Sequence, residues 1–164
     1  MEREAVVGEE RPLIADVYLK RFDEGWELEA DPTVAYAVGK FEGEWWPELS
    51  TSDLEIDSPY NLYQTTGLTP TPICNPRQES MLAVLRPASS PFYLFTARKD
   101  GSGRHLFARD ATEQAANQEL IDSGADLTEY DSAYTEWLLT EESTWMSPDR
   151  SVAWIRDESF FASG

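Results

Sequence analysis

The stretch FYLFTARKDGSGRHLFAR, residues 92–109, decides the fold. Residues 92–97 and 105–107 are rich in aromatic and apolar side chains, which are typical of β-strands. The segment DGSG at 100–103 lies between them and consists of residues that favour turns. The sequence therefore predicts an antiparallel hairpin at the centre of a small sheet.

Two helices are predicted on the N-terminal side of this hairpin. Apolar residues recur at four-residue spacing over residues 10–23, which predicts a helix that ends before Gly25. Asn75 as a cap and Pro76 at the first helical position predict another helix, which Pro87 ends. The apolar positions of this second helix are Met81, Leu82, Val84 and Leu85.

Shorter signals lie around these elements. The Asp-x-x-Glu spacing at 110–113 is that of a capping box and predicts a helix to about residue 121. Asp31 is interpreted as the cap of a short apolar segment that reaches residue 39. Residues 1–7 are interpreted as the last turns of an earlier helix. Helical segments are thus expected on both sides of the hairpin.

These elements predict an α+β fold in which short helices pack on a small antiparallel sheet. A chain of 164 residues is long enough for one such domain, which we assign to residues 1–118. Residues 119–164 carry half of the excess negative charge and yet are rich in Trp and Phe. We interpret them as an acidic, Trp-rich C-terminal extension that packs at least in part.

Charge and composition exclude several classes of function. With 31 acidic and 13 basic side chains the formal net charge is −18, which disfavours the phosphate contacts that nucleic acid binding needs. No apolar run approaches the ~20 residues of a membrane span. A single cysteine, Cys74, and a single histidine, His105, exclude an internal disulfide and a Cys/His zinc cage. We therefore expect carboxylate chemistry or plain binding, with no metal and no cofactor.

Six short motifs stand in order along the first 118 residues and together resemble a known family. They are Glu2–Arg3–Glu4, ERPLIADVYLKRF from residue 10, DPTVAYA at 31–37, SPYNLY at 58–63, GLTPTPICNP at 67–76, and the hairpin sequence. In this combination they resemble the endolytic murein transglycosylases, the MltG or YceG-like family. The resemblance covers roughly residues 1–118.

This resemblance implies an enzyme that cuts the glycan strands of peptidoglycan internally and leaves 1,6-anhydro-muramyl ends. It implies a place in the cell envelope, at the outer face of the plasma membrane, with cell-wall synthesis proteins as further partners. Family members carry an N-terminal membrane anchor and a LysM-like subdomain, so the chain is expected to correspond to a catalytic domain lacking its N-terminal part.

The resemblance also assigns a catalytic acid. The first glutamate of a motif resembling VEKE falls on Glu2, one residue after the start of the sequence. A lytic transglycosylase can work with one carboxyl group, which must stay protonated near neutral pH and therefore needs a pKa raised by burial. The alternative interpretation of Glu2 is an exposed glutamate in a frayed first turn.

Further candidates for contact with the substrate are polar residues within or beside the motifs. They are Glu4, Asp31, Asn61, Tyr63, Asn75 and His105. Four of them have a structural alternative: Glu4 as a solvated side chain, Asp31 and Asn75 as helix caps, and Tyr63 as a half-buried tyrosine.

The sequence departs from the family pattern at several positions. Leu62 stands where the family reads Thr, and Thr69 and Thr71 replace a proline and a glycine. Gln114 and Ala115 stand where the family often has a His-Asn pair. A second hypothesis is therefore a non-catalytic or truncated relative that binds peptidoglycan glycan or a cell-wall protein.

Overall fold

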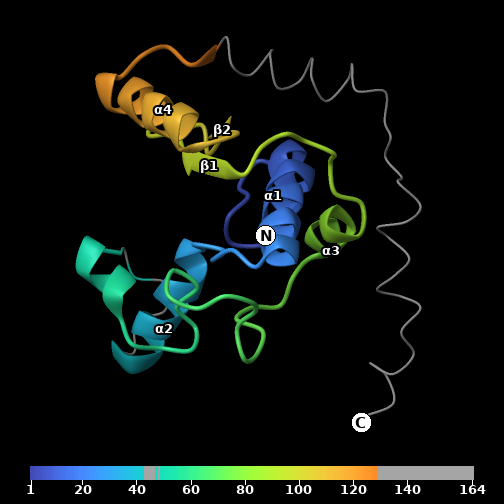
Figure 1. Ribbon diagram of the computed structural model, residues 1–164, viewed down its shortest axis with the longest axis vertical. Helices are drawn as coiled ribbons and strands as arrows, with labels where there is room; N and C mark the ends of the chain where they lie inside the picture. Colours follow the sequence, from blue (N-terminus) through green and yellow to red (C-terminus); the bar gives the residue numbers. More distant parts are fainter. Residues whose placement is uncertain (43–46, 48, 129–164) are drawn as a thin grey trace.

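The computed structural model describes residues 1–42, 47 and 49–128. Within these ranges the chain forms four α-helices and one two-stranded antiparallel sheet, so the α+β prediction is confirmed. In chain order the elements are α1 (Arg11–Glu24), α2 (Asp31–Glu42), α3 (Gln78–Leu85), β1 (Leu94–Ala97), β2 (His105–Ala108) and α4 (Ala111–Ser123) (Figure 1). Short 3-10 turns lie at Gly8–Glu10 and Thr51–Glu55.

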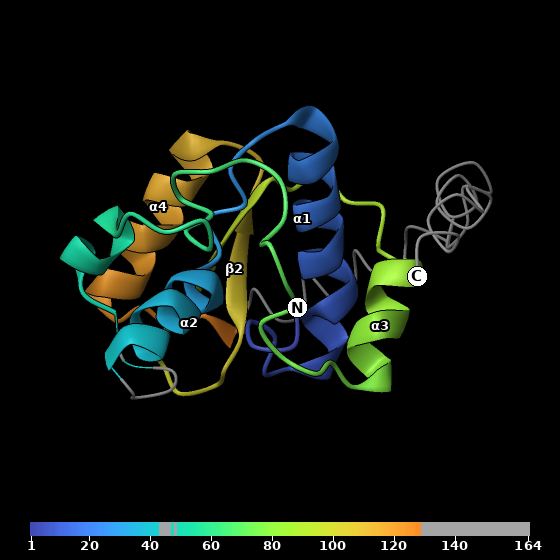
Figure 2. The same cartoon turned by 90° about the horizontal axis from the view of Figure 1, so that it is seen from below.

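The hairpin is covered by helices on both faces. Helix α1 lies between α3 and β2, and α4 lies on the far side of the hairpin (Figure 2). Leu13 and Val17 of α1 share the main core with Phe107, while the preceding strand residue, Leu106, packs with Ile121 of α4. Successive side chains of a strand point to opposite faces, so β2 contributes to two apolar clusters at once.

The hairpin prediction is confirmed in position and direction. Leu94 pairs with Ala108 and Ala97 with His105, and the turn contains Gly101 at φ 80°. Gly103, at φ 70°, lies against Val6, so that a Cβ atom at this position would come within 2.9 Å of the valine side chain. Glycine is required there both by the backbone and by this close approach.

The helix predictions at 10–23 and 110–121 are also confirmed. Helix α1 ends at Gly25, which adopts a left-handed φ of 75°. Helix α4 is capped by Asp110, the residue before its start, whose carboxylate accepts hydrogen bonds from the amides of Thr112 and Glu113.

Three local predictions are wrong in detail. Residues 1–5 form a single turn, closed by the Ala5 amide on the Met1 carbonyl, instead of the end of a helix. Asp31 is the first residue of α2 and not its cap, and α2 continues to Glu42. Helix α3 begins at Gln78 with Arg77 at the cap position, two residues later than the Asn75 cap predicts.

The apolar residues of α3 do not enter the core. The helix instead packs on α1 through small residues, Ser80 and Ala83, which are buried. Its four large apolar residues are 41–53% exposed: Met81, Leu82, Val84 and Leu85. Small residues allow the two helices to approach closely, which the apolar pattern alone does not predict.

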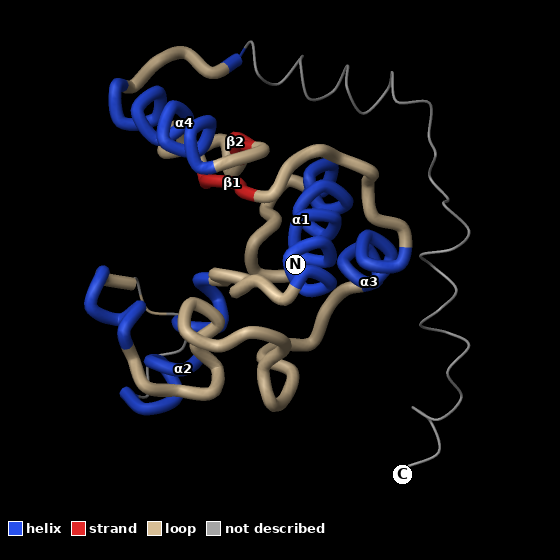
Figure 3. Tube along the Cα trace, in the orientation of Figure 1, coloured by secondary structure: helices blue, strands red, loops and turns tan. Residues whose placement is uncertain are grey.

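A long connection without regular helix or strand leads from the 3-10 turn at Thr51–Glu55 to α3 (Figure 3). Asn61, with no exposed surface, fixes its course. The Asn61 Nδ2 atom donates to the carbonyls of Leu54 (2.9 Å) and Ile56 (3.0 Å), and its Oδ1 atom accepts from the Tyr63 amide (3.0 Å). Asn61 therefore shapes the loop and places Tyr63, which its sequence position alone does not reveal.

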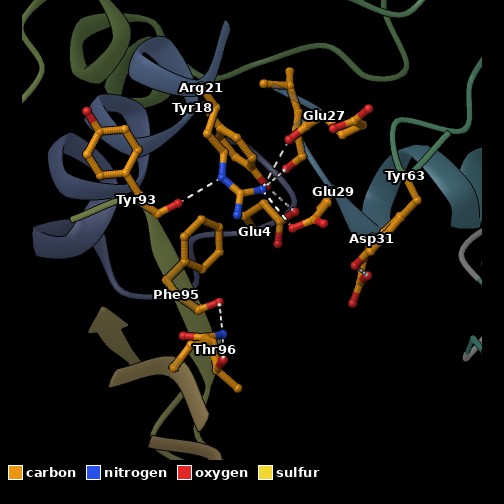
Figure 4. Close-up of polar contacts among 12 residues, drawn as sticks. Glu4, Tyr18, Arg21, Glu27, Glu29, Asp31, Tyr63, Tyr93, Phe95 and Thr96 are labelled. Atoms are coloured by element: carbon orange, nitrogen blue, oxygen red, sulfur yellow. Dashed lines mark hydrogen bonds and ion pairs between the residues drawn. The ribbon is translucent and has the colours of Figure 1, made fainter. Parts of the chain in front are cut away.

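Arg21 joins three segments from inside the molecule. Its guanidinium donates to the Tyr93 carbonyl just before β1 (2.8 Å) and to the carbonyls of Glu27 and Leu28, and it pairs with Glu29 at 2.9 Å (Figure 4). The side chain is 6% exposed. These contacts connect α1 to the hairpin and to the segment that leads into α2.

No helix in the part of the chain that the structure describes is long and apolar enough to cross a bilayer. Helix α4 runs across the predicted domain boundary between residues 118 and 119. Most of the predicted extension, residues 129–164 with its Trp and Phe residues, lies outside the described residues. The division into a domain and an extension stays a prediction.

Replacing Arg21 by Lys is expected to lower the free energy of unfolding by about 2 kcal/mol or more, because an ammonium group cannot reproduce the planar fork of donors. Urea denaturation followed by circular dichroism measures this. The control is Lys99→Met, which removes an exposed ion pair to Asp122 and should leave the unfolding midpoint close to that of the parent chain. Equal midpoints for the parent and Arg21→Lys would contradict the prediction.

Replacing Asn61 by Ala is expected to lower the free energy of unfolding by about 1–3 kcal/mol, because two carbonyls and one amide lose their partner. The matched control is Asn75→Ala at an exposed position, where little change is expected. Thermal unfolding of both variants distinguishes the buried, hydrogen-bonded Asn61 from the exposed Asn75. A larger decrease in the free energy of unfolding for Asn75→Ala than for Asn61→Ala would contradict the structural role of Asn61.

Candidate active site

Two glutamates of the N-terminal turn, Glu2 and Glu4, lie in opposite electrostatic environments although only Arg3 separates them in sequence. The Glu2 carboxylate reaches the start of α3. Its Oε2 atom accepts hydrogen bonds from the Arg77 amide (3.0 Å) and the Ser80 hydroxyl (2.7 Å), and its Oε1 atom lies 3.0 Å from Nε of Arg77. Glu2 thus provides from a distant segment the cap that α3 lacks in its own sequence.

These contacts favour the ionised form of Glu2. The hydrogen bond from the Arg77 amide, followed by that from Ser80, holds the pKa of the Glu2 carboxyl below its usual value. The positive end of the α3 helix dipole acts in the same direction. The geometry therefore favours the ionised form of Glu2, and its assignment as the catalytic acid stays a prediction.

The surroundings of Glu4, in contrast, favour the protonated form of its carboxyl group. It is partly buried beside α1, and its Oε1 atom accepts a hydrogen bond of 2.6 Å from the Tyr18 hydroxyl. Burial raises the pKa of Glu4 above its usual value, although the Tyr18 hydrogen bond and the Met1 amino group oppose this. Of the two glutamates, Glu4 has the property required of a general acid.

Asp31 and Tyr63 form a second polar pair in the same region (Figure 4). The Tyr63 hydroxyl donates to Oδ1 of Asp31 at 2.6 Å and joins the long loop to the start of α2. Burial and the hydrogen bond to Asp31 raise the pKa of Tyr63, which keeps the phenol protonated. The negative charge of Asp31 in turn raises the pKa of Glu4, so the two parts interact electrostatically.

A cavity of about 570 Å³ opens beside the N-terminal turn. Its lining comes from the turn, from α2 and from the loop before α3: Glu2, Arg3, Tyr36, Ile73, Cys74, Asn75 and Arg77. The Tyr36 ring contacts that of Tyr60 with 5.0 Å between centroids and a tilt of 45° between the ring planes, and Tyr36 adds an aromatic side chain to the lining. Among the described residues no group of three or more His, Cys, Asp or Glu side chains is placed to hold a metal ion.

The residues proposed from the sequence thus fall into separate groups. Asp31 is hydrogen-bonded to Tyr63 and interacts electrostatically with Glu4, whereas Glu2 and Asn75 line the cavity. Asn61 is buried in the loop. His105 is 4% exposed, with its backbone amide and Nδ1 both held by the carboxylate of Glu10 at 3.1 and 2.8 Å.

Sequence reasoning missed two residues that contact the carboxyl groups of Glu2 and Glu4. Tyr18 falls within the helix predicted at 10–23 and received no functional assignment, although a tyrosine directed at the core needs a partner for its hydroxyl. No local sequence pattern marks Arg77 as a partner of Glu2, because the two residues are 75 positions apart in the chain.

Comparisons with known proteins agree with the resemblance found in the sequence. The endolytic murein transglycosylase of Bacillus subtilis is 42% identical over 101 residues, and that of Streptococcus pneumoniae is 32% identical over 98. These alignments cover 62% and 59% of this chain but only 27% and 18% of the relatives. The chain therefore spans a minor part of the length of the curated relatives that it matches.

The fold has a counterpart among solved structures. A crystal structure of a yceG-like protein from Listeria monocytogenes is 37% identical, with a TM-score of 0.63 over 70% of this chain and 36% of that chain. The YceG-like family matches residues 1–120, the part that contains the hairpin, the cavity and both glutamates. The chain belongs to the YceG-like family.

Proposed function

We propose that the chain contributes the acid-bearing part of an endolytic peptidoglycan lytic transglycosylase, with Glu4 as its general acid and base. Support comes from relatives that carry this name and from the contrast between the two glutamates. The observation on which the proposal rests most is the partly buried Glu4 carboxyl, whose pKa is raised, beside a Glu2 carboxylate whose pKa is lowered.

The reaction needs one carboxyl group that first gives and then takes a proton. Protonated Glu4 donates its proton to the glycosidic oxygen as the bond from that oxygen to the anomeric carbon breaks. The carboxylate then accepts the proton of the sugar's own 6-hydroxyl, whose oxygen bonds to the anomeric carbon. The products are a 1,6-anhydro end and a free hydroxyl on the leaving sugar, and the carboxyl group is protonated again.

The surroundings of Glu4 suit this cycle. Burial favours the acid form of Glu4, and the hydrogen bond from the Tyr18 hydroxyl stabilises the carboxylate that forms in the first step. We place the glycan strand along the cavity, where Asn75 and Arg3 offer hydrogen bonds and Tyr36 an aromatic face. Asp31 and Tyr63 would bind sugar hydroxyls from the other side.

The compartment and partners follow from the substrate. We place the chain at the cell envelope, at the outer face of the plasma membrane, because peptidoglycan lies there. Neutral sugar rings are held by hydrogen bonds and aromatic contact, so an acidic protein can bind them despite its charge. Cell-wall synthesis proteins would be its protein partners.

Replacing Glu4 by Gln is expected to lower the release of anhydro-ended fragments from purified peptidoglycan by at least about a thousandfold, because the proton donor is lost. The matched variant Glu2→Gln keeps the proton donor and should still cleave, although KM can change because Glu2 lines the cavity, and its thermal stability should be lower because the α3 cap is weakened. Mass spectrometry of the released fragments measures both. Loss of cleavage in Glu2→Gln with the fold intact, and retention in Glu4→Gln, would overturn the assignment.

A parent chain that releases no anhydro product would contradict the catalytic proposal. Cosedimentation with peptidoglycan in that case would support the second hypothesis, a relative that binds glycan without cutting it. The same preparations serve for both measurements.

The cleavage rate is expected to fall as the pH rises through the folded pKa of Glu4, because only the protonated acid can donate. Since burial raises this pKa, the fall should come at a higher pH than for an ordinary glutamate. A pH-rate profile checks this, and Glu2→Gln should show the same descending limb. A rate that stays constant from the ordinary glutamate pKa to mildly alkaline pH would contradict a single Glu4 acid.

A further inference from the structure

Tyr18 is the one residue whose hydroxyl contacts Glu4 in the contacts that the structure describes. It extends from α1, and its ring packs edge-on against Phe95 of β1 with 5.6 Å between centroids. The hydroxyl lies 2.6 Å from Oε1 of Glu4. The ring is therefore fixed by the core, and its oxygen is fixed by the carboxyl group.

The direction of this hydrogen bond is determined by the chemistry of the two groups. Burial and the nearby Glu4 charge raise the pKa of Tyr18 well above its usual value, so the phenol retains its proton. A protonated phenol donates to a carboxylate, and the recorded contact assigns Oε1 as the acceptor. Because Oε1 accepts this hydrogen bond, a proton on Glu4 is carried by the second oxygen, Oε2.

We propose that Tyr18 is a positioning residue that holds Glu4 through Oε1 and leaves Oε2 to exchange the proton with the substrate. This inference rests on the proposed role of Glu4 as general acid. Tyr18 does not touch the sugar; it acts through Glu4. Its hydroxyl also moderates the effect of burial, because it stabilises the carboxylate that each proton donation leaves behind.

Other charged groups act on Glu4 and remain in place when the Tyr18 hydroxyl is removed. The Met1 amino group and His105 on β2 favour the carboxylate, whereas Asp31 on α2 disfavours it. These groups do not depend on the Tyr18 hydroxyl for their own positions. A change of Tyr18 to Phe therefore removes one hydrogen bond and retains the ring contact with Phe95.

The test is Tyr18→Phe, with the pKa of Glu4 measured directly. The side-chain carboxyl carbons of ¹³C-labelled glutamates are followed by NMR against pH, and the Glu4 signal is assigned by its absence in Glu4→Gln. The expected result is a rise of about one to two pKa units, since a hydrogen bond to a charged group is lost. The descending limb of the pH-rate profile should move by the same amount.

Kinetics give a second readout. At the low-pH plateau, kcat should fall severalfold, because a weaker and less well oriented acid transfers its proton more slowly, while KM stays unchanged. A purely structural role would lower the stability without moving the pH profile.

The matched control is Tyr93→Phe, which removes a tyrosine hydroxyl that donates to Glu24 at 2.7 Å on the surface. It should move neither the Glu4 pKa nor the pH profile. Should Tyr18→Phe not fold, 3-fluorotyrosine at position 18 keeps the ring and makes the hydroxyl a stronger donor. The Glu4 pKa is then expected to fall.

An unchanged Glu4 pKa in Tyr18→Phe, or in the fluorinated chain, overturns the inference. Failure of the underlying proposal is recognised separately. If Glu4→Gln cleaves peptidoglycan like the parent, Glu4 is not the acid, and Tyr18 loses its positioning role whatever the NMR titration shows.

Discussion

The buried guanidinium of Arg21 is the contact on which the arrangement of the other elements depends. It joins α1 to the strand that follows Tyr93 and to the segment that leads into α2. Tyr18 lies about one turn earlier on the same helix and faces Glu4, so the helix that is fixed by Arg21 also carries the partner of the candidate acid. Contacts from α1 therefore position the hairpin, the segment before α2 and the N-terminal turn relative to one another.

The two glutamates show how environment assigns roles to identical side chains. Glu2 meets a backbone amide, a hydroxyl and a guanidinium at a helix start, and all three favour its charged form. Glu4 meets one phenol and the edge of the core, where desolvation favours the neutral form. The pKa values of the two glutamates are shifted in opposite directions because their side chains enter different parts of the fold.

Local signals predicted the elements, and distant contacts determined the site. The hairpin, α1 and α4 follow from turn residues, apolar spacing and the Asp110 cap, all of which act within a few residues. The cap of α3 could not be predicted, because Glu2 supplies it from another segment. The resemblance was confirmed for the family, whereas the proposal of Glu4 in place of Glu2 depends on the burial of Glu4 and on the contact of Glu2 with Arg77, both of which arise only in the fold.

The contacts of Glu2 have a consequence for the entropy of ligand binding. A short turn without contacts to its neighbours loses conformational freedom when a ligand orders it, and that loss weakens the apparent affinity. Here Glu2 binds the turn to α3 at one end, and Glu4 binds it to α1 at the other. This entropy is lost when the chain folds, so in the proposed function a glycan strand would meet a Glu4 carboxyl that is already held in position.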